Sequence, residues 1–363
     1  MTGELFMKSK KIVFTGGGST GHVTVNLALI PYYQEQGYSV HYIGSRQGIE
    51  AELIGRMEGV KYKGIATGKL RRYFSVEIAK DSLRVLKGVR EAYQYLKKIK
   101  PGVVFSKGGF VSVPVVLAAR ILRIPLVIHE SDLTPGLANR IALPWADYVC
   151  TTFQEAATQL RRSNVVHVGA MIRQELREGN RQRGRSRLGF SDDKPVLLFM
   201  GGSLGAKNLN EALYHIIPDL IPDYQIIHIC GKGQQTGAPV TEGYHVFEYV
   251  QEELPDLMAA ADLVISRAGS NSIFEFLALH KPMLLIPLSD KVSRGDQIIN
   301  ARSFEASGYA RVLLAEDLTA SSLLNAIHDL DRNQEKYIQN MRAYRTSDAM
   351  TNIIKVIQQA EVK

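Results

Sequence analysis

The sequence predicts an α/β protein made of two Rossmann-like, doubly wound domains that face a cleft. An apolar run, a glycine turn and the start of a helix occur together at 11–22, as Lys11-Ile-Val-Phe-Thr-Gly-Gly-Gly-Ser-Thr-Gly-His22, and again at 196–206, as Val196-Leu-Leu-Phe-Met-Gly-Gly-Ser-Leu-Gly-Ala206. Short apolar runs alternate with helical patterns along the rest of the chain, which is typical of parallel sheets. The length of 363 residues suits two domains of ordinary size.

The short apolar runs give the expected strands in order, with helical patterns between them. In the first half the strands are expected at 11–15, 39–43, 60–65, 103–106, 126–129, 148–152 and 165–168. In the second half they are expected at 196–200, 226–230, 245–249, 263–266 and 283–287. Charge and glycine replace the apolar periodicity near 169–187. We therefore expect an N-terminal domain over 7–169, a C-terminal domain over 170–340, and a last helical segment over 341–363 that packs back on the first domain.

The composition excludes several classes of protein. Cys150 and Cys230 lie far apart, each in an apolar run, so neither a disulfide framework nor a zinc cluster is indicated. No apolar run reaches the roughly 18 to 20 residues that span a bilayer, and no signal-peptide core is present, so we expect a cytoplasmic location. The net charge of +8 admits nucleic acid, anionic lipid or a phosphorylated substrate. Because no nucleic-acid-binding motif accompanies the charge, we expect no nucleic-acid partner.

One short segment mixes basic and large apolar residues. Arg71 and Arg72 stand beside Leu70, Tyr73 and Phe74. This mixture suits a surface that rests on anionic lipid headgroups, and we predict membrane contact there. A loop whose apolar residues enter the core fits the sequence equally well.

The glycine turns indicate the class of ligand. Glycine lets a backbone approach a ligand closely, and a helix that starts there directs unpaired N–H groups and its positive dipole end outward. Phosphate-bearing ligands suit such a turn, although tight packing of a strand on a helix gives the same pattern. Another glycine turn follows a strand at 107–114, and polar segments follow strands at 129–139, 267–275 and 293–300. Open α/β sheets bind their ligands at such strand ends.

Together these segments closely resemble the MurG family, bacterial N-acetylglucosaminyltransferases that convert lipid I to lipid II in peptidoglycan synthesis. The matching segments lie at 16–22, 108–112, 129–139, 201–206 and 267–275, in the family's order over nearly the whole chain. The resemblance implies the glycosyltransferase B fold, an inverting mechanism, UDP-N-acetylglucosamine as donor and undecaprenyl-linked lipid I as acceptor. It also implies a peripheral position on the cytoplasmic face of the cell membrane, an anionic membrane surface as partner, and contact with other cell-wall synthesis proteins.

The resemblance also implies the site residues. Glu275 would accept hydrogen bonds from the ribose, Ser203 and Arg173 would hold the donor diphosphate, and Val250 would lie beside the uracil. The remaining donor contacts would be Ser19, Thr20, Gly21, Asp132, Ser270, Asn271, Ser272 and Gln297. The glycines expected at the acceptor diphosphate are Gly17, Gly18, Gly108 and Gly109.

The expected chemistry needs a general base and no resident metal. His22 stands at a helix start, and an imidazole suits proton transfer near neutral pH, so it is the first candidate for the base. Glu130 and Asp132 are the alternatives. No Asp-x-Asp motif stands at a strand end, so we expect no tightly bound cofactor, while divalent ions can assist the phosphates from solution.

Other activities share parts of this pattern. A glycosyltransferase with another lipid acceptor, such as diacylglycerol, is the nearest alternative, and a UDP-sugar epimerase of the same architecture is another. A Rossmann dehydrogenase would match the spacing of Gly16, Gly18 and Gly21. The segment Gly44-Ser-Arg46, however, follows the second strand where that class needs an acidic residue for the ribose.

Overall fold

The computed structural model describes residues 10–68, 76–201, 206–235, 237–290, 293–345 and 347–362. The chain forms two compact units. Unit 1 comprises Met1–Met171 and Ser347–Lys363, and unit 2 comprises Ile172–Thr346. The returning C-terminal segment begins at Ser347 and not at 341 as expected, because the helix α14 (Gln334–Ala343) belongs to unit 2.

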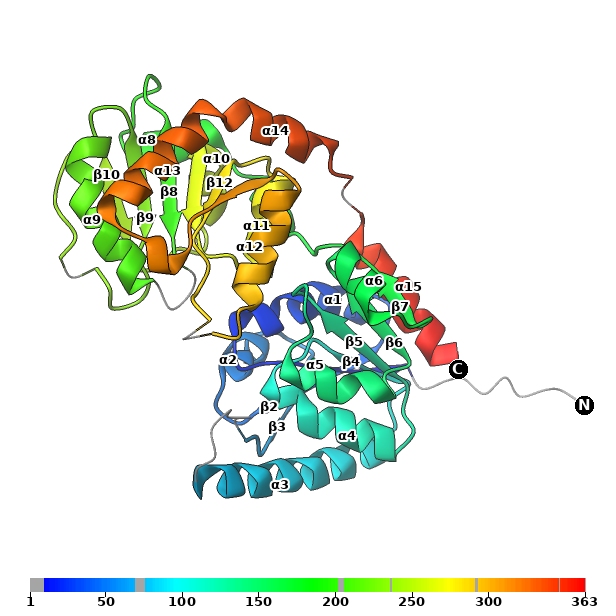
Figure 1. Ribbon diagram of the computed structural model, residues 1–363. Helices are drawn as coiled ribbons and strands as arrows, with labels where there is room; N and C mark the ends of the chain where they lie inside the picture. Colours follow the sequence, from blue (N-terminus) through cyan, green and yellow to red (C-terminus); the bar gives the residue numbers. More distant parts are fainter. Residues whose placement is uncertain are drawn as a thin grey trace, which may run out of the picture. The chain divides into compact units, whose positions relative to one another are not determined.

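Unit 1 is a parallel sheet with helices on both faces (Figure 1). Its strands, in the described part of the unit, are β1 (Lys11–Thr15), β2 (Ser39–Ser45), β3 (Lys61–Ile65), β4 (Val103–Ser106), β5 (Leu126–Glu130), β6 (Tyr148–Thr151) and β7 (Val165–His167). Its α-helices are α1 (Thr24–Glu35), α2 (Ile49–Gly55), α3 (Val76–Ile99), α4 (Val113–Ile121), α5 (Leu137–Ala142), α6 (Gln154–Leu160) and α15 (Ala349–Val362). The sheet order is β3-β2-β1-β4-β5-β6-β7. Every strand expected in the first half is present, β1 and β4 with the expected bounds and the others with an end shifted by one or two residues.

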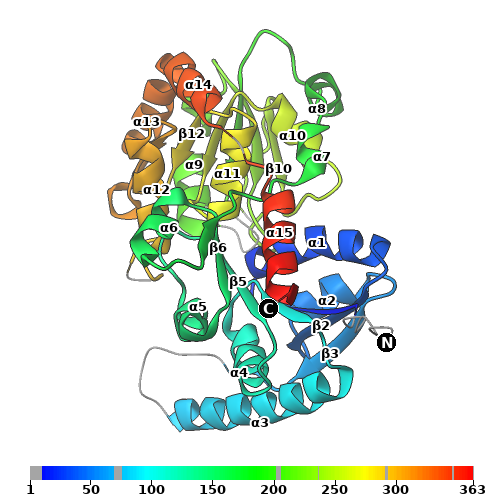
Figure 2. The same cartoon turned by 90° about the vertical axis from the view of Figure 1, so that its right-hand side faces the viewer.

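The alternation of side chains along β1 builds two hydrophobic layers. Successive residues of a strand point to opposite faces. Ile12 and Phe14 pack on the layer of α1 and α15, which includes Ile357. Val13 packs on the other layer with Val115 of α4, beside α3. The C-terminal helix α15 therefore completes one face of the first sheet (Figure 2).

Unit 2 is a second parallel sheet. Its strands, in the described part of the unit, are β8 (Val196–Met200), β9 (Gln225–Ile229), β10 (Tyr244–Phe247), β11 (Leu263–Ser266), β12 (Met283–Leu285) and β13 (Ala310–Val312). Its α-helices are α7 (Gln174–Arg177), α8 (Arg181–Arg187), α9 (Lys207–Leu220), α10 (Leu254–Ala260), α11 (Ser270–Ala278), α12 (Asp296–Ala306), α13 (Ala320–Arg332) and α14. The sheet order is β10-β9-β8-β11-β12-β13. The edge strand β13 was not expected, because the charged Arg311 interrupts its short apolar run.

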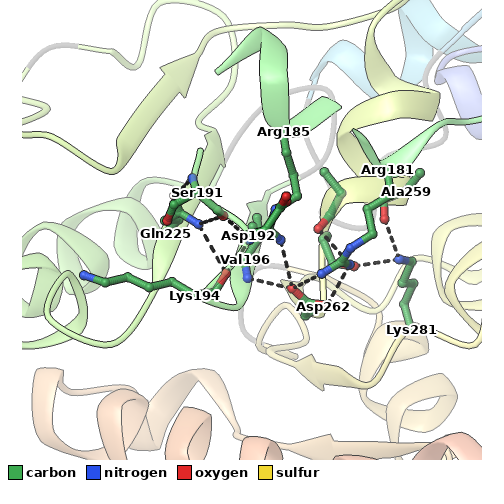
Figure 3. Close-up of polar contacts among 12 residues, drawn as sticks. Arg181, Arg185, Ser191, Asp192, Lys194, Val196, Gln225, Ala259, Asp262 and Lys281 are labelled. Carbon is green, nitrogen blue, oxygen red and sulfur yellow. Dashed lines mark hydrogen bonds and ion pairs between the residues drawn. The ribbon is translucent and has the colours of Figure 1, made fainter. Parts of the chain in front are cut away.

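An ion-pair network holds the linker helix α8 against the amino ends of β8 and β11 (Figure 3). Asp262, just before β11, accepts two hydrogen bonds from Arg181 at 2.7 and 3.1 Å and one from the Val196 backbone at 2.8 Å. The Arg185 guanidinium, only 1% exposed, donates to the Lys194 carbonyl at 2.6 Å and to that of Ser191. Ligands of open α/β sheets bind at the carboxyl ends of the strands, so this network at the amino ends has a structural role.

Candidate active site

Two glycine turns meet where the strand order of unit 1 reverses. β1 and β4 are neighbours in the sheet, and β2 and β5 lie on their outer sides. Residues 16–18 follow β1, and Gly108 and Gly109 follow β4 with φ of +88° and +78°, which only glycine adopts readily. A Cβ on Gly109 would collide with the Gly17 carbonyl oxygen, so the two backbones touch. Such a switch point is the usual ligand site of a doubly wound sheet.

His22 lies beside both turns. It ends a short 3-10 helix, Thr20–His22, that follows the first turn and leads into α1. Its Nδ1 is 2.9 Å from the Ser19 hydroxyl, and a Cβ on Gly109 would lie 3.0 Å from the same nitrogen. The structure thus brings the first candidate base together with the glycines expected at the acceptor diphosphate.

Glu130 holds the loop after β5. It is 6% exposed, and its carboxylate accepts hydrogen bonds from the backbone of Asp132 at 3.0 Å, the backbone of Gly136 at 2.9 Å and the Asn139 amide at 2.9 Å. Burial, followed by the nearby Asp132 carboxylate, raises the pKa of Glu130. Asp132 itself is half-buried. The Glu130 carboxylate is therefore committed to the local structure of this loop.

Lys107 is a buried cation that the sequence analysis missed. It directly precedes the second glycine turn, is 2% exposed and donates to the Ser131 hydroxyl in the next loop. Burial lowers the pKa of Lys107, while the carboxylates of Glu130 and Asp132 oppose that effect. In the sequence Lys107 is recognisable only as a lysine next to a glycine pair. A lysine on the surface can have the same neighbours, so this pattern does not reveal that Lys107 is buried.

In unit 2, the residues expected to bind the ribose and the diphosphate of the donor, Glu275 and Arg173, bind each other. Arg173 donates to both carboxylate oxygens of Glu275, with Nε to Oε1 at 2.7 Å and Nη2 to Oε2 at 2.9 Å. The Glu275 side chain is 5% exposed and that of Arg173 is 35% exposed. The bidentate pair connects the segment before α7 to α11, so it fixes the orientation of both groups.

The other residues expected at the donor are spread over unit 2 and unit 1. Those near the carboxyl ends of unit 2 strands are Val250, Ser270, Asn271, Ser272 and Gln297. Val250 is 8% exposed, and the three residues 270–272 form the first turn of α11. The side-chain oxygen of Gln297 accepts a hydrogen bond from the Leu288 backbone at 3.1 Å. Ser19, Thr20, Gly21 and Asp132 lie in unit 1. Ser203 lies outside the described residues, as do Leu70, Arg71, Arg72, Tyr73 and Phe74.

Two properties of the residues that the structure describes bear on metals and membranes. In that part of the chain, no group of three or more His, Cys, Asp or Glu side chains is arranged to hold a metal ion. No helix there has the length and apolar character needed to cross a membrane.

Comparison with known proteins decides the family. Residues 12–151 match the glycosyltransferase family 28 N-terminal domain, and residues 196–357 match the glycosyltransferase family 28 C-terminal domain. The chain belongs to glycosyltransferase family 28. As a family 28 glycosyltransferase it is an enzyme, and its two parallel sheets are the two domains of the glycosyltransferase B fold.

Full-length relatives of this family 28 chain carry a specific name. A protein of Geobacillus thermodenitrificans is 55% identical over 96% of this chain and 98% of its own length. A protein of Bacillus cereus is 54% identical over 97% of this chain and 100% of its own. Both are named UDP-N-acetylglucosamine--N-acetylmuramyl-(pentapeptide) pyrophosphoryl-undecaprenol N-acetylglucosamine transferase, the second with the number 2.

Solved structures agree on the fold. MurG of Acinetobacter baumannii superimposes with a TM-score of 0.74 at 25% identity, covering 96% of this chain and 99% of that one. The calicheamicin glycosyltransferase CalG4 superimposes with a TM-score of 0.70 at 14% identity, covering 98% and 97%. A putative UDP-N-acetylglucosamine 2-epimerase of Listeria monocytogenes reaches 0.66 at 13% identity, covering 97% and 96%. At 14% and 13% identity these last two similarities concern the fold alone, so the epimerase likeness gives no support to an epimerase activity.

Proposed function

We propose that this chain transfers N-acetylglucosamine from UDP-N-acetylglucosamine to the muramyl 4-hydroxyl of lipid I, giving lipid II for peptidoglycan synthesis. The observation that carries the proposal is identity above 50% over nearly the whole length of relatives named for this transfer. The two acceptor-side glycine turns also suit an acceptor that bears a diphosphate, which diacylglycerol lacks.

The acceptor hydroxyl must lose a proton as it attacks the anomeric carbon from the face opposite the UDP. His22 is the proposed base, because its ring lies against Gly109 and is oriented by Ser19 at Nδ1. When Nδ1 carries the proton and Ser19 accepts it, Nε2 becomes the basic nitrogen. The attack forms the new glycosidic bond with inverted configuration, and the UDP leaves as the other product.

The negative charge that develops on the leaving diphosphate would be met in unit 2. Arg173 uses Nε and one N–H of Nη2 on Glu275, and a guanidinium has five N–H donors in all. The remaining donors of this partly exposed side chain suit phosphate oxygens. Glu275, an acceptor-only carboxylate when ionised, suits the ribose hydroxyls. Catalysis would then rest on preorganised charge more than on covalent chemistry.

The acceptor is a lipid, and we propose that the enzyme works at the cytoplasmic face of the membrane. Helix α3 exposes Leu83 at 68% and Leu86 at 66%, with Arg84 and Lys87 exposed beside them. Apolar and basic side chains on one exposed helix suit the interface of an anionic bilayer. Replacing both leucines by serine is expected to reduce binding to phosphatidylglycerol vesicles in a co-sedimentation assay and to leave transfer to a short-chain, water-soluble acceptor unchanged.

The test of the activity is transfer of labelled N-acetylglucosamine to a solubilised lipid I analogue, run beside diacylglycerol and a control without acceptor. We expect product with lipid I only, and most of it lost in His22→Ala. Transfer to diacylglycerol would contradict the acceptor, and epimerisation without acceptor would contradict the reaction. Full activity of His22→Ala would move the base to another residue. Activity should survive EDTA, since no bound metal is proposed.

A further inference from the structure

Glu50 is a buried carboxylate that the transfer chemistry above does not use. It lies in the first turn of α2 and is completely buried. Its carboxylate accepts hydrogen bonds from the Gly18 backbone at 3.2 Å, the Ser45 backbone at 3.0 Å and the Ser45 hydroxyl at 2.5 Å. Both carboxylate oxygens of Glu50 therefore have hydrogen-bond donors. Glu50 therefore connects the end of β2 to the glycine turn after β1.

The surrounding glycines leave space for this carboxylate. A Cβ on Gly48 would lie 2.6 Å from both carboxylate oxygens, and one on Gly44 would lie 2.9 Å from the Glu50 Cγ. A Cβ on Gly17 would collide with the carboxylate group. Gly48 has an extended backbone, with φ of −131°, that any residue could adopt. Its missing side chain is thus explained by Glu50 and the Ser45 hydroxyl beside it, and not by backbone geometry.

The bond from Gly18 has a consequence for the acceptor turn. The Gly18 N–H donates to the Glu50 carboxylate, so a contact between Gly18 and the acceptor diphosphate would have to use another part of this glycine. The Glu50 carboxylate behind the turn cannot attract an acceptor that carries a negative diphosphate, since like charges repel. The effect of Glu50 on the site must therefore be geometric.

We propose that Glu50 is a positioning residue for the acceptor side of the transferase site. By holding the Gly18 amide it fixes the turn whose Gly17 carbonyl touches Gly109, and through the next residues it fixes Ser19 and the His22 imidazole. The inference rests on the proposed function, because it assigns Glu50 to the acceptor half of that reaction.

Glu50→Gln tests the proposal at nearly constant volume. The side-chain amide has one acceptor oxygen and an NH2 group, so either the Gly18 or the Ser45 backbone N–H loses its partner. We expect kcat/KM for the lipid I analogue to fall about a hundredfold, as a misplaced base or acceptor turn would cause. The Kd for UDP should stay at the wild-type value, because the uridine contacts are expected in unit 2. Amide hydrogen exchange of a peptide covering 12–22 should become faster.

Two matched variants separate positioning from general damage. Ser45→Ala removes one hydrogen bond to the same carboxylate and leaves the hydrogen bond from Gly18. We therefore expect kcat/KM and the rate of amide hydrogen exchange in 12–22 to stay at their wild-type values. Gly48→Ala presses on the carboxylate from the side of α2 with its charge retained, so it should lower kcat/KM as Glu50→Gln does. Gly48→Ala also serves as the test if Glu50→Gln fails to fold.

Three results would overturn the inference: unchanged kcat/KM in Glu50→Gln, an equal loss in Ser45→Ala, or a parallel loss of UDP binding in both Glu50→Gln and Gly48→Ala. Failure of the wild-type enzyme to use lipid I would instead overturn the proposed function. In that case hydrogen exchange at 12–22 still decides whether Glu50 fixes the turn.

Discussion

Glu275→Gln separates a ligand-binding carboxylate from a structural one. In the structure Glu275 is bound through both oxygens to Arg173, at 2.7 and 2.9 Å, and only 5% of its side chain is exposed. The same carboxylate is expected to accept hydrogen bonds from the ribose of the donor. Glutamine keeps the shape but removes the charge and one acceptor, so both roles are weakened at once.

The two roles have different magnitudes. Breaking a buried ion pair costs about 3 to 5 kcal/mol. Because Arg173 is 35% exposed, solvent takes over part of its stabilisation, and we expect the free energy of unfolding to fall by about 2 kcal/mol. A hydrogen bond to a charged group contributes about 1.5 to 3 kcal/mol, which is about a tenfold to hundredfold change in the Kd for UDP.

Calorimetric titration with two nucleotides distinguishes the roles. UDP and 2′,3′-dideoxy-UDP differ only in the ribose hydroxyls that Glu275 would bind. The substitution should weaken UDP binding strongly, whereas wild type and Glu275→Gln should bind the dideoxy nucleotide with similar affinity. An equal loss with both nucleotides, or no loss with UDP beside reduced stability, would refute the reasoning and leave Glu275 only as the partner of Arg173.

Three further predictions concern the stability of each unit. Gly109→Ala should destabilise unit 1 by about 2 kcal/mol in urea unfolding, because φ is +78° and the added Cβ meets the turn after β1; an unchanged midpoint would contradict the touching turns. Asp262→Asn should cost about 3 kcal/mol, since the buried Arg185 loses a carboxylate partner; an unchanged melting temperature would contradict the structural role of the network. Burial lowers the pKa of His228 from 6.5 to about 4. The stability that the neutral, buried imidazole contributes to the fold is therefore complete above pH 6.5 and is lost as the pH falls toward 4. The loss should be up to about 3 kcal/mol, read by hydrogen exchange of β8 and β9 peptides. His228→Gln should flatten the pH dependence of stability, and substitution of the exposed His215 by glutamine should not. Equal behaviour of the two variants would refute the assignment of this pH dependence to His228.

The fold could be predicted from the sequence because its strongest pattern is local. A buried parallel strand reads as a continuous apolar run, and a glycine turn marks where it ends. Val196–Met200 and the other long runs were therefore found with correct bounds or with ends shifted by one or two residues. The edge strand β13 was missed, since Arg311 at its centre breaks the continuous apolar run by which the other strands were found.

The contacts inside the site could not be predicted, because they depend on which charged side chains become buried. Glu50 stands six residues after Gly44 and looks like an ordinary helix carboxylate in the sequence. Only the fold shows that it reaches back to Gly18 and to Ser45. The glycine at 48, needed neither for a positive φ nor for a tight turn, was the one local signal of its position.

The choice of base can be narrowed by how the nearby carboxylates are used. Glu130 is 6% exposed and its oxygens accept three hydrogen bonds, two of them from the backbone of the loop that it closes. Burial raises the pKa of Glu130 and so favours uptake of a proton. Three of the about four lone-pair sites of this carboxylate are already occupied by donors that fix the loop, which leaves a single site for an acceptor hydroxyl. The His22 ring lies against the glycine turn itself, with its Nδ1 2.9 Å from the Ser19 hydroxyl. The same glycine contact that leaves no room for a Cβ at 109 thus places an imidazole where the acceptor is expected, which favours His22 over Glu130 on geometry even though Glu130 has the raised pKa.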